Sequence, residues 1–193
     1  NEFAFKLLNS WPQWEKNFVN LIGEKFSGKT HLINIFLEKF KGIKIEAKEI
    51  NNEFLKNIKV FENIIIENFD DKIDENILYS LLNIIDQDNK YIILTSKNPI
   101  VDYSFNLNDL NSRSKNFLLC NIEKPGDDLM FALILKNLSD RQISIDKKLV
   151  DFIIKRIDRS YGKIFDFIYK IDKISLKRKK SIDFKIIKEA LGE

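Results

Sequence analysis

The most specific chemical pattern in the sequence is the segment 23–30, Gly-Glu-Lys-Phe-Ser-Gly-Lys-Thr. It fits G-x-x-x-x-G-K-[ST], the pattern of a loop whose backbone N–H groups surround phosphate oxygens. The glycines let the chain pass close to the anion. Lys29 would reach the β- and γ-phosphates, and the Thr30 hydroxyl would bind Mg²⁺. We therefore predict a nucleotide site at Gly23, Glu24, Lys25, Phe26, Ser27, Gly28, Lys29, Thr30 and His31.

A second group with possible chemistry is the segment 63–68, Asn-Ile-Ile-Ile-Glu-Asn. Three consecutive isoleucines predict a strand buried on both faces, and Glu67 would emerge beside the phosphates and hold Mg²⁺ through water. The usual arrangement is Asp followed by Asp or Glu. Asn68 cannot accept a proton from an attacking water, so we predict nucleotide binding with weak intrinsic hydrolysis. The alternative is that Glu67 and Asn68 simply end a strand.

A sheet is needed to bring these groups together, and five short runs predict its strands. The runs are mostly apolar on both faces, which favours a central parallel sheet covered by helices. They lie at 18–22, 42–46, 63–67, 91–95 and 117–122. Residues at helical spacing separate them at 29–40, 51–57 and 74–88, and Asp74 is a candidate N-cap. Alternating strands and helices predict an α/β domain with right-handed crossovers.

The pattern changes after Lys124-Pro125-Gly126, a sequence that typically marks a turn. No convincing strand pattern follows. Helices are expected at 127–138, 146–157, 160–174 and 183–191. We therefore predict a P-loop α/β core at 1–124, with helices on both faces of its sheet, and an all-helical lid subdomain at 125–193.

Composition excludes several classes of protein. Hydrophobic residues make up 44% of the 193 residues and include 16 Phe, which excludes a disordered chain. The longest apolar stretch has seven residues, at 129–135, far fewer than the ~20 that cross a bilayer. The only cysteine, Cys120, cannot form an intrachain disulfide, and one histidine cannot build a multi-histidine metal site. Without a recognisable signal peptide, we expect a cytoplasmic protein that does not contact a membrane.

Charge is unevenly distributed along the chain. The formal net charge is +3, which does not demand a nucleic-acid partner. Residues 126–193 contain 16 basic and 11 acidic residues, a net charge of +5, and the cluster at 177–180 supplies most of the excess. This cluster is either a solvated helix end or a patch that contacts an acidic partner or a phosphate.

Four parts of the chain resemble the AAA+ ATPases of the bacterial DnaA initiator clade, and within it the Hda family of DnaA regulators. They are 1–4 with Trp11-Pro12, then 28–32, 110–113, and the helical segments 157–165, 181–184 and 187–189. The phosphate loop alone is generic, but the L-x-S-R motif at 110–113 together with this lid is more specific. An initiator would continue beyond Glu193 into a helix-turn-helix domain, so the resemblance favours the regulators.

The resemblance implies a role for Arg113. In the regulators, this arginine would act in trans, as a finger directed at the ATP that DnaA holds. A planar, always-charged guanidinium suits that role because it can stabilise developing phosphoryl charge. The alternative is a surface ion pair.

The resemblance also implies groups that sense the nucleotide. Ser96, Lys97 or Asn98, which follow the run at 91–95, would sense the γ-phosphate, unless they form an ordinary exit from strand to turn. In the lid, Gly162 stands where an arginine usually reaches the phosphates, and Lys163 beside it would supply a point charge.

The implied ligands are ADP or ATP with Mg²⁺, and the nucleotide would serve as a structural switch. The implied partners are DnaA and the DNA polymerase sliding clamp, with indirect or weak contact to DNA and assembly into a homo-oligomer. The clamp-binding motif of the family would precede Asn1.

Two other functions remain open at the level of sequence. One is a helicase-loader-like AAA+ ATPase that acts on DNA, and the other is a non-catalytic adaptor with a vestigial pocket. Robust DNA-stimulated ATPase activity would favour the loader. Thermal stability that does not respond to ADP or ATP would favour the adaptor.

Overall fold

The structure is a computed structural model that describes residues 2–70 and 72–193. It consists of two compact units. The first contains residues 2–24 and 28–123 other than Asp71, and the second contains 25–27 and 124–193. In the described ranges, no helix is long and apolar enough to cross a membrane.

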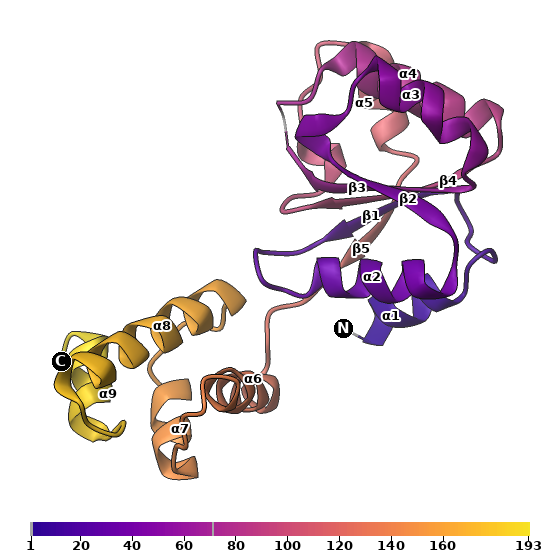
Figure 1. Cartoon of the computed structure of the whole chain (residues 1–193). Coiled ribbons are helices and arrows are strands. Elements are labelled where there is room, and N and C mark those ends of the chain that lie inside the picture. Colours follow the sequence, from indigo (N-terminus) through magenta and orange to yellow (C-terminus); the bar gives the residue numbers. More distant parts are fainter. Residues whose placement is uncertain (1, 71) are drawn as a thin grey trace. The chain divides into compact units, whose positions relative to one another are not determined.

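The first unit is built on a parallel sheet, as the apolar runs predict. Within the described residues it has five strands in the order β2-β3-β4-β1-β5, and every neighbouring pair is parallel (Figure 1). The strands are β1 (Phe18–Ile22), β2 (Gly42–Glu46), β3 (Asn63–Phe69), β4 (Tyr91–Ser96) and β5 (Leu118–Asn121). Because the strands are parallel, their carboxyl ends meet at one edge of the sheet, where ligands of such folds bind.

Helices cover both faces of this sheet, as predicted. Helices α1 (Glu2–Asn9) and α2 (Lys29–Lys39) lie on one face, and α3 (Asn52–Asn57), α4 (Glu75–Gln87) and α5 (Asn108–Ser114) lie on the other (Figure 1). Short 3₁₀ turns occur at Ala47–Glu49, Ile58–Val60 and Ile100–Asp102. Helices α1 and α5 were not among the predicted helices, and α5 contains Arg113.

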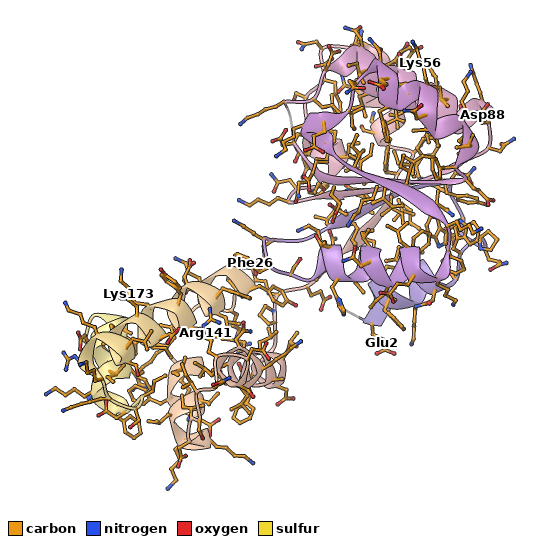
Figure 2. The ribbon with its side chains drawn as sticks, viewed as in Figure 1. Glu2, Phe26, Lys56, Asp88, Arg141 and Lys173 are labelled. Atoms are coloured by element: carbon orange, nitrogen blue, oxygen red, sulfur yellow. The ribbon has the colours of Figure 1, made fainter. Side chains whose placement is uncertain are left out.

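Side chains fill the space between the sheet and the helices (Figure 2). The three isoleucines of β3, Ile64, Ile65 and Ile66, are completely buried. They need apolar cover on both faces, and α4 supplies one side through Leu78, Leu81, Leu82 and Ile85. Helix α4 begins where predicted because the Asp74 side chain accepts hydrogen bonds from the Asn76 and Ile77 amides. Burial raises the pKa of the Cys120 thiol in β5 to about 11, which fits a small core residue.

The second unit has an apolar core of its own. Its helices are α6 (Asp127–Ser139), α7 (Lys147–Ile154), α8 (Tyr161–Arg178) and α9 (Phe184–Leu191). Asp146, Ser160 and Asp183 cap α7, α8 and α9 by accepting amide hydrogen bonds, which explains why these helices begin near the predicted positions. Ile134, Ile153, Ile168 and Ile187 from the four helices are completely buried in one cluster. The Phe26 ring belongs to this unit and stacks on Phe165, with 4.5 Å between centroids.

Candidate nucleotide-binding site

The predicted phosphate loop begins where β1 ends. The Gly23 amide donates a hydrogen bond of 3.1 Å to the Ser96 carbonyl, which ties the loop to the end of β4. Gly28 has a φ of 93° and Phe26 a φ of 67°, so the loop turns twice through the left-handed region. At Gly28 this conformation requires glycine, because a side chain is strained there. Helix α2 starts at the next residue, Lys29, so its free amides lie at the end of the loop.

The Lys29 side chain crosses the loop. Its ammonium donates to the Gly23 carbonyl at 2.6 Å and to the Glu24 carbonyl at 2.9 Å. Burial lowers the pKa of Lys29 from 10.5, while the negative charges of Glu24 and Glu67 oppose this shift. A half-buried cation held by neutral carbonyls is suited to an incoming phosphate, which would provide the opposite charge.

The other predicted loop residues differ in exposure. Gly23 and Ser27 are buried, Glu24 and Gly28 are intermediate, and Lys25, Phe26, Thr30 and His31 are exposed. The ammonium of Lys25 lies 5.1 Å from the centroid of the Phe26 ring. Thr30 therefore presents its hydroxyl at the surface, in the first turn of α2.

Glu67 lies near the carboxyl end of β3 and is only 5% exposed. Its Oε2 is 3.3 Å from the Lys44 ammonium of β2, which also donates to Asn34 Oδ1 of α2 at 2.9 Å. Among the described residues, Oε1 of Glu67 has no hydrogen-bond partner. This oxygen and the Thr30 hydroxyl oxygen are the kind of ligand that Mg²⁺ takes, so the residues fit the ion. They provide fewer acidic oxygens than two adjacent carboxylates would.

Asn68 adopts an unusual backbone conformation after Glu67. Its φ is 56°, and the pairing of β3 with β4 shifts register between Ile66 and Phe69. The Asn68 amide donates to Thr95 Oγ1 at 3.0 Å, and its side chain donates to both carboxylate oxygens of Glu46 at 3.2 and 3.0 Å. A carboxamide is not a base, so Asn68 cannot take a proton from water, and weak hydrolysis stays a prediction.

The three predicted γ-phosphate sensors lie where β4 ends: Ser96 is its last residue, and Lys97 and Asn98 follow it. Lys97 and Asn98 are exposed. Ser96 is buried, and its hydroxyl donates to the Asn98 carbonyl at 2.6 Å and accepts from the Asn20 side chain at 2.8 Å. The Ser96 hydroxyl is thus already bound within the protein. Which of the three senses a phosphate stays a prediction.

Sequence reasoning missed Asn20, a completely buried polar residue in β1. Its side chain donates to the Leu94 carbonyl at 3.0 Å and to Ser96, and it accepts from the Ile100 amide at 2.8 Å. Asn20 therefore connects β1, the end of β4 and the 3₁₀ turn that follows. The available signal was that Asn20 is the one polar residue in the apolar run 18–22. The other residues of that run predicted a buried strand, so Asn20 was not considered as a separate functional residue.

Arg113 lies on α5, and its side chain is 27% exposed. Its Nη1 is 3.6 Å from Asp86 Oδ2 of α4, and its guanidinium carbon is 5.7 Å from the centroid of the Tyr79 ring. The arginine is therefore neither buried in the interior nor fully solvated. A single, partly exposed ion pair of this kind holds a side chain weakly.

Glu75 of α4 positions the helix that contains Arg113. Its carboxylate accepts from the Asn106 amide at 3.0 Å and the Leu107 amide at 2.9 Å, immediately before α5. These hydrogen bonds lower the pKa of Glu75. The N-cap residue Leu107 has no side chain that could accept the free amides of α5, and the Glu75 carboxylate instead holds the two residues that lead into the helix.

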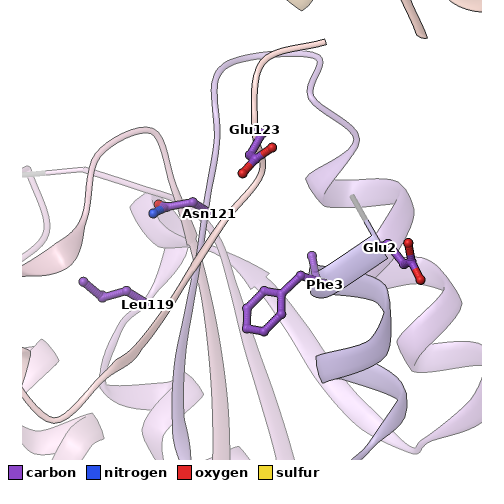
Figure 3. A pocket seen from close by; sticks show the side chains of 6 residues that line it. Glu2, Phe3, Leu119, Asn121 and Glu123 are labelled. Atoms are coloured by element: carbon purple, nitrogen blue, oxygen red, sulfur yellow. The ribbon is translucent and has the colours of Figure 1, made fainter. Parts of the chain in front are cut away.

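The remaining candidate positions lie apart from the loop in sequence. Lys163 is exposed in the first turn of α8, in the second unit, and its amide donates to Ser160 Oγ. A groove of about 430 Å³ lies between α1 and β5, and Figure 3 shows Phe3, Leu119 and Asn121 along it. None of its lining residues is a predicted nucleotide ligand. In the described part of the chain, no group of three or more His, Cys, Asp or Glu could hold a metal ion.

Solved structures with similar folds include domain III of the replication initiation protein DnaA from Thermotoga maritima. It is 16% identical, with a TM-score of 0.75 over 99% of this chain and 89% of that domain. A RuvB P216G mutant from the same organism is 12% identical, with a TM-score of 0.73 over 99% of this chain and 67% of RuvB. The fold is that of an AAA+ domain. At these identities, the likeness shows the fold alone.

The chain also resembles in fold AMPPCP-bound DnaA from Aquifex aeolicus, which is 20% identical, with a TM-score of 0.68. That match covers 91% of this chain but only 60% of the DnaA chain, so the domain corresponds to a part of the initiator. No protein-family model matches the chain. An uncharacterized protein from Haemophilus influenzae is 23% identical over an alignment of 189 residues. The match covers 91% of this chain and 81% of that protein.

Proposed function

We propose that this AAA+ domain is a nucleotide-binding regulator of replication initiation that promotes the hydrolysis of ATP bound to DnaA. ADP or ATP would bind at the loop 23–30, with Lys29 on the phosphates. Thr30 and Glu67 would hold Mg²⁺, which neutralises phosphate charge when it is bound. The likeness to DnaA, which binds AMPPCP in the Aquifex aeolicus structure, supports this assignment of the ligand.

The observation that carries the proposal is the contrast between Asn68 and Arg113. Asn68 replaces the acid that would accept a proton from water, and its side chain is bound to Glu46. This arrangement favours a domain that holds its own nucleotide with little turnover. Arg113, in contrast, is partly exposed and is held by one weak ion pair and a contact with the Tyr79 ring.

The proposed action of Arg113 requires it to exchange partners. Leaving Asp86, the guanidinium would approach the triphosphate on DnaA and stabilise the charge that develops on the transferred phosphoryl group. Glu75 would keep α5 in place during this exchange, because its carboxylate fixes the two amides before the helix. We also propose that the sliding clamp takes part in this encounter and that contact with DNA is indirect.

The experiment follows ATP bound to DnaA. DnaA loaded with labelled ATP is mixed with clamp-loaded DNA, with and without the chain, and the conversion to ADP is measured. The proposal expects the chain to accelerate conversion, while the chain alone hydrolyses ATP slowly in the presence or absence of DNA. Unchanged conversion on DnaA would contradict it.

The likeness to a replication initiator DnaA bound to AMPPCP and single-stranded DNA favours one alternative, a motor that acts on DNA. Such a motor needs its own turnover, so ATPase activity of the isolated chain that rises strongly with DNA would support it. A chain whose thermal stability ignores ADP and ATP would instead be an adaptor with a vestigial pocket.

A further inference from the structure

We propose that Lys44 serves as a built-in cation at Glu67, so that this chain binds its nucleotide with little dependence on Mg²⁺. The inference rests on the proposed nucleotide binding at the loop 23–30. It deepens that function: Thr30 and Glu67 would still hold Mg²⁺ when it is present, but nucleotide binding would not depend on the ion, because Lys44 already supplies a cation at Glu67.

The contacts around Glu67 support this role. The carboxylate is 5% exposed, and the Lys44 ammonium lies 3.3 Å from its Oε2. Asn34 of α2 accepts a second hydrogen bond from Lys44 at 2.9 Å, which fixes the ammonium between β2 and α2. The side chain of Lys44 is 34% exposed, so it remains partly accessible to solvent.

Charge balance explains why a lysine could replace the ion. Two adjacent carboxylates together have a charge of −2, which one Mg²⁺ neutralises. Here Asn68 is neutral, and the single charge of Glu67 is already balanced by Lys44. Lys29 adds a second positive charge close enough to Glu67 for the two charges to interact. With Lys44 neutralising the buried carboxylate, the charge of Lys29 remains available for the phosphate oxygens.

Glu46 is the other carboxylate in this region, and it could in principle restore a pair of acids with Glu67. The two residues are register partners in β2 and β3. Glu46, however, accepts the Asn68 side-chain amide with both of its oxygens. We therefore assign Glu46 to holding Asn68, and its replacement should leave the metal dependence of binding unchanged.

The test measures ADP binding to the whole chain by isothermal titration calorimetry, once in excess Mg²⁺ and once in EDTA. The unmodified chain should change its affinity less than about threefold between the two conditions. Lys44→Met should raise the Mg²⁺ dependence to about tenfold or more, because the Glu67 charge then needs another cation. Glu46→Gln and Lys48→Met, a change at an exposed lysine of the neighbouring 3₁₀ turn, should behave like the unmodified chain.

A buried carboxylate without its partner destabilises a protein, so Lys44→Met could fail to fold. The double variant Lys44→Met/Glu67→Gln removes both charges and should bind ADP without a gain in Mg²⁺ dependence. The comparison of ADP binding in Mg²⁺ and in EDTA for the unmodified chain tests the proposal even if the variants do not fold.

The outcomes separate the two proposals. ADP binding that falls tenfold or more in EDTA for the unmodified chain would overturn the role of Lys44 but leave the proposed function standing. A gain in Mg²⁺ dependence in Glu46→Gln rather than Lys44→Met would also overturn it. No ADP binding in either condition would overturn both.

Discussion

Replacing Lys29 by Met should abolish nucleotide binding without unfolding the protein. Methionine keeps the length of the side chain and removes its charge. In the structure, the ammonium makes two hydrogen bonds, to the Gly23 and Glu24 carbonyls, and burial already lowers its pKa. The variant loses those bonds but also loses the cost of desolvating a cation. We expect these terms to nearly cancel, leaving the free energy of unfolding within about 1 kcal/mol.

The expected loss of ADP affinity is much larger. Hydrogen bonds to charged groups contribute about 1.5–3 kcal/mol each, so losing two phosphate contacts should weaken binding by roughly 10²- to 10⁴-fold. At a ligand concentration of about 100 times Kd, ADP should stabilise the unmodified chain by about 2.7 kcal/mol, which raises Tm by roughly 5–10 °C for a chain of this size. Scanning calorimetry with and without ADP measures both effects.

The matched control is Lys25→Met, which removes an exposed lysine from the same loop. This variant should keep most of the ADP-dependent rise in Tm. A full ADP-dependent rise in Tm in Lys29→Met, or an equal loss of that rise in both variants, would refute the assignment of Lys29 to the phosphates.

The affinity for ADP should also depend on pH, because only the charged form of Lys29 binds phosphate. Since burial lowers the pKa of Lys29, the affinity should fall as pH rises through that pKa, before the ordinary value of 10.5 is reached.

Two further predictions concern the residues that position the site. Asn20→Leu leaves three polar partners of a completely buried side chain unsatisfied, so urea unfolding should show a loss of about 3 kcal/mol or more, and a loss below about 1 kcal/mol would contradict the network. Glu75→Gln should lower Tm at pH 7. The pKa of Glu75 in the folded protein lies below its ordinary value of 4.5. The contribution of its carboxylate to stability is therefore fully present above pH 4.5 and is lost as pH falls through the folded pKa. The difference in Tm between the two proteins should therefore shrink below about pH 4.5, and a constant difference would count against an ionised Glu75 that holds the Asn106 and Leu107 amides.

The sheet could be predicted because its strands are buried on both faces. Continuous apolar runs such as Ile64–Ile66 have few alternatives to a central parallel strand. Helix α4 was equally clear, since its apolar residues recur at helical spacing behind the N-cap Asp74. In these cases the signal lies within a single segment of sequence.

Helix α5 could not be predicted in the same way, because what stabilises its start is distant in sequence. The two residues before it are held by Glu75, about 30 residues earlier, and Leu107 gives no local capping signal. The ion pair between Lys44 and Glu67 likewise depends on the register of β2 against β3, and the left-handed turn at Asn68 depends on its contacts with Thr95 and Glu46. Such features follow from tertiary pairing, which no local pattern encodes.

The central proposal depends on Arg113, and Arg141 provides a matched control. Arg141 is 30% exposed and lies 3.4 Å from Asp172 in the second unit, much as Arg113 pairs with Asp86. The most direct measurement is the single-turnover rate at which DnaA hydrolyses its bound ATP in the presence of saturating amounts of each variant and clamp-loaded DNA.

An arginine supplied in trans accelerates phosphoryl transfer by about 10³- to 10⁵-fold in comparable systems. Arg113→Ala should therefore remove the stimulation, while it still binds ADP and unfolds like the unmodified chain, and Arg141→Ala should stimulate normally. Equal stimulation by the unmodified chain and Arg113→Ala would contradict the account.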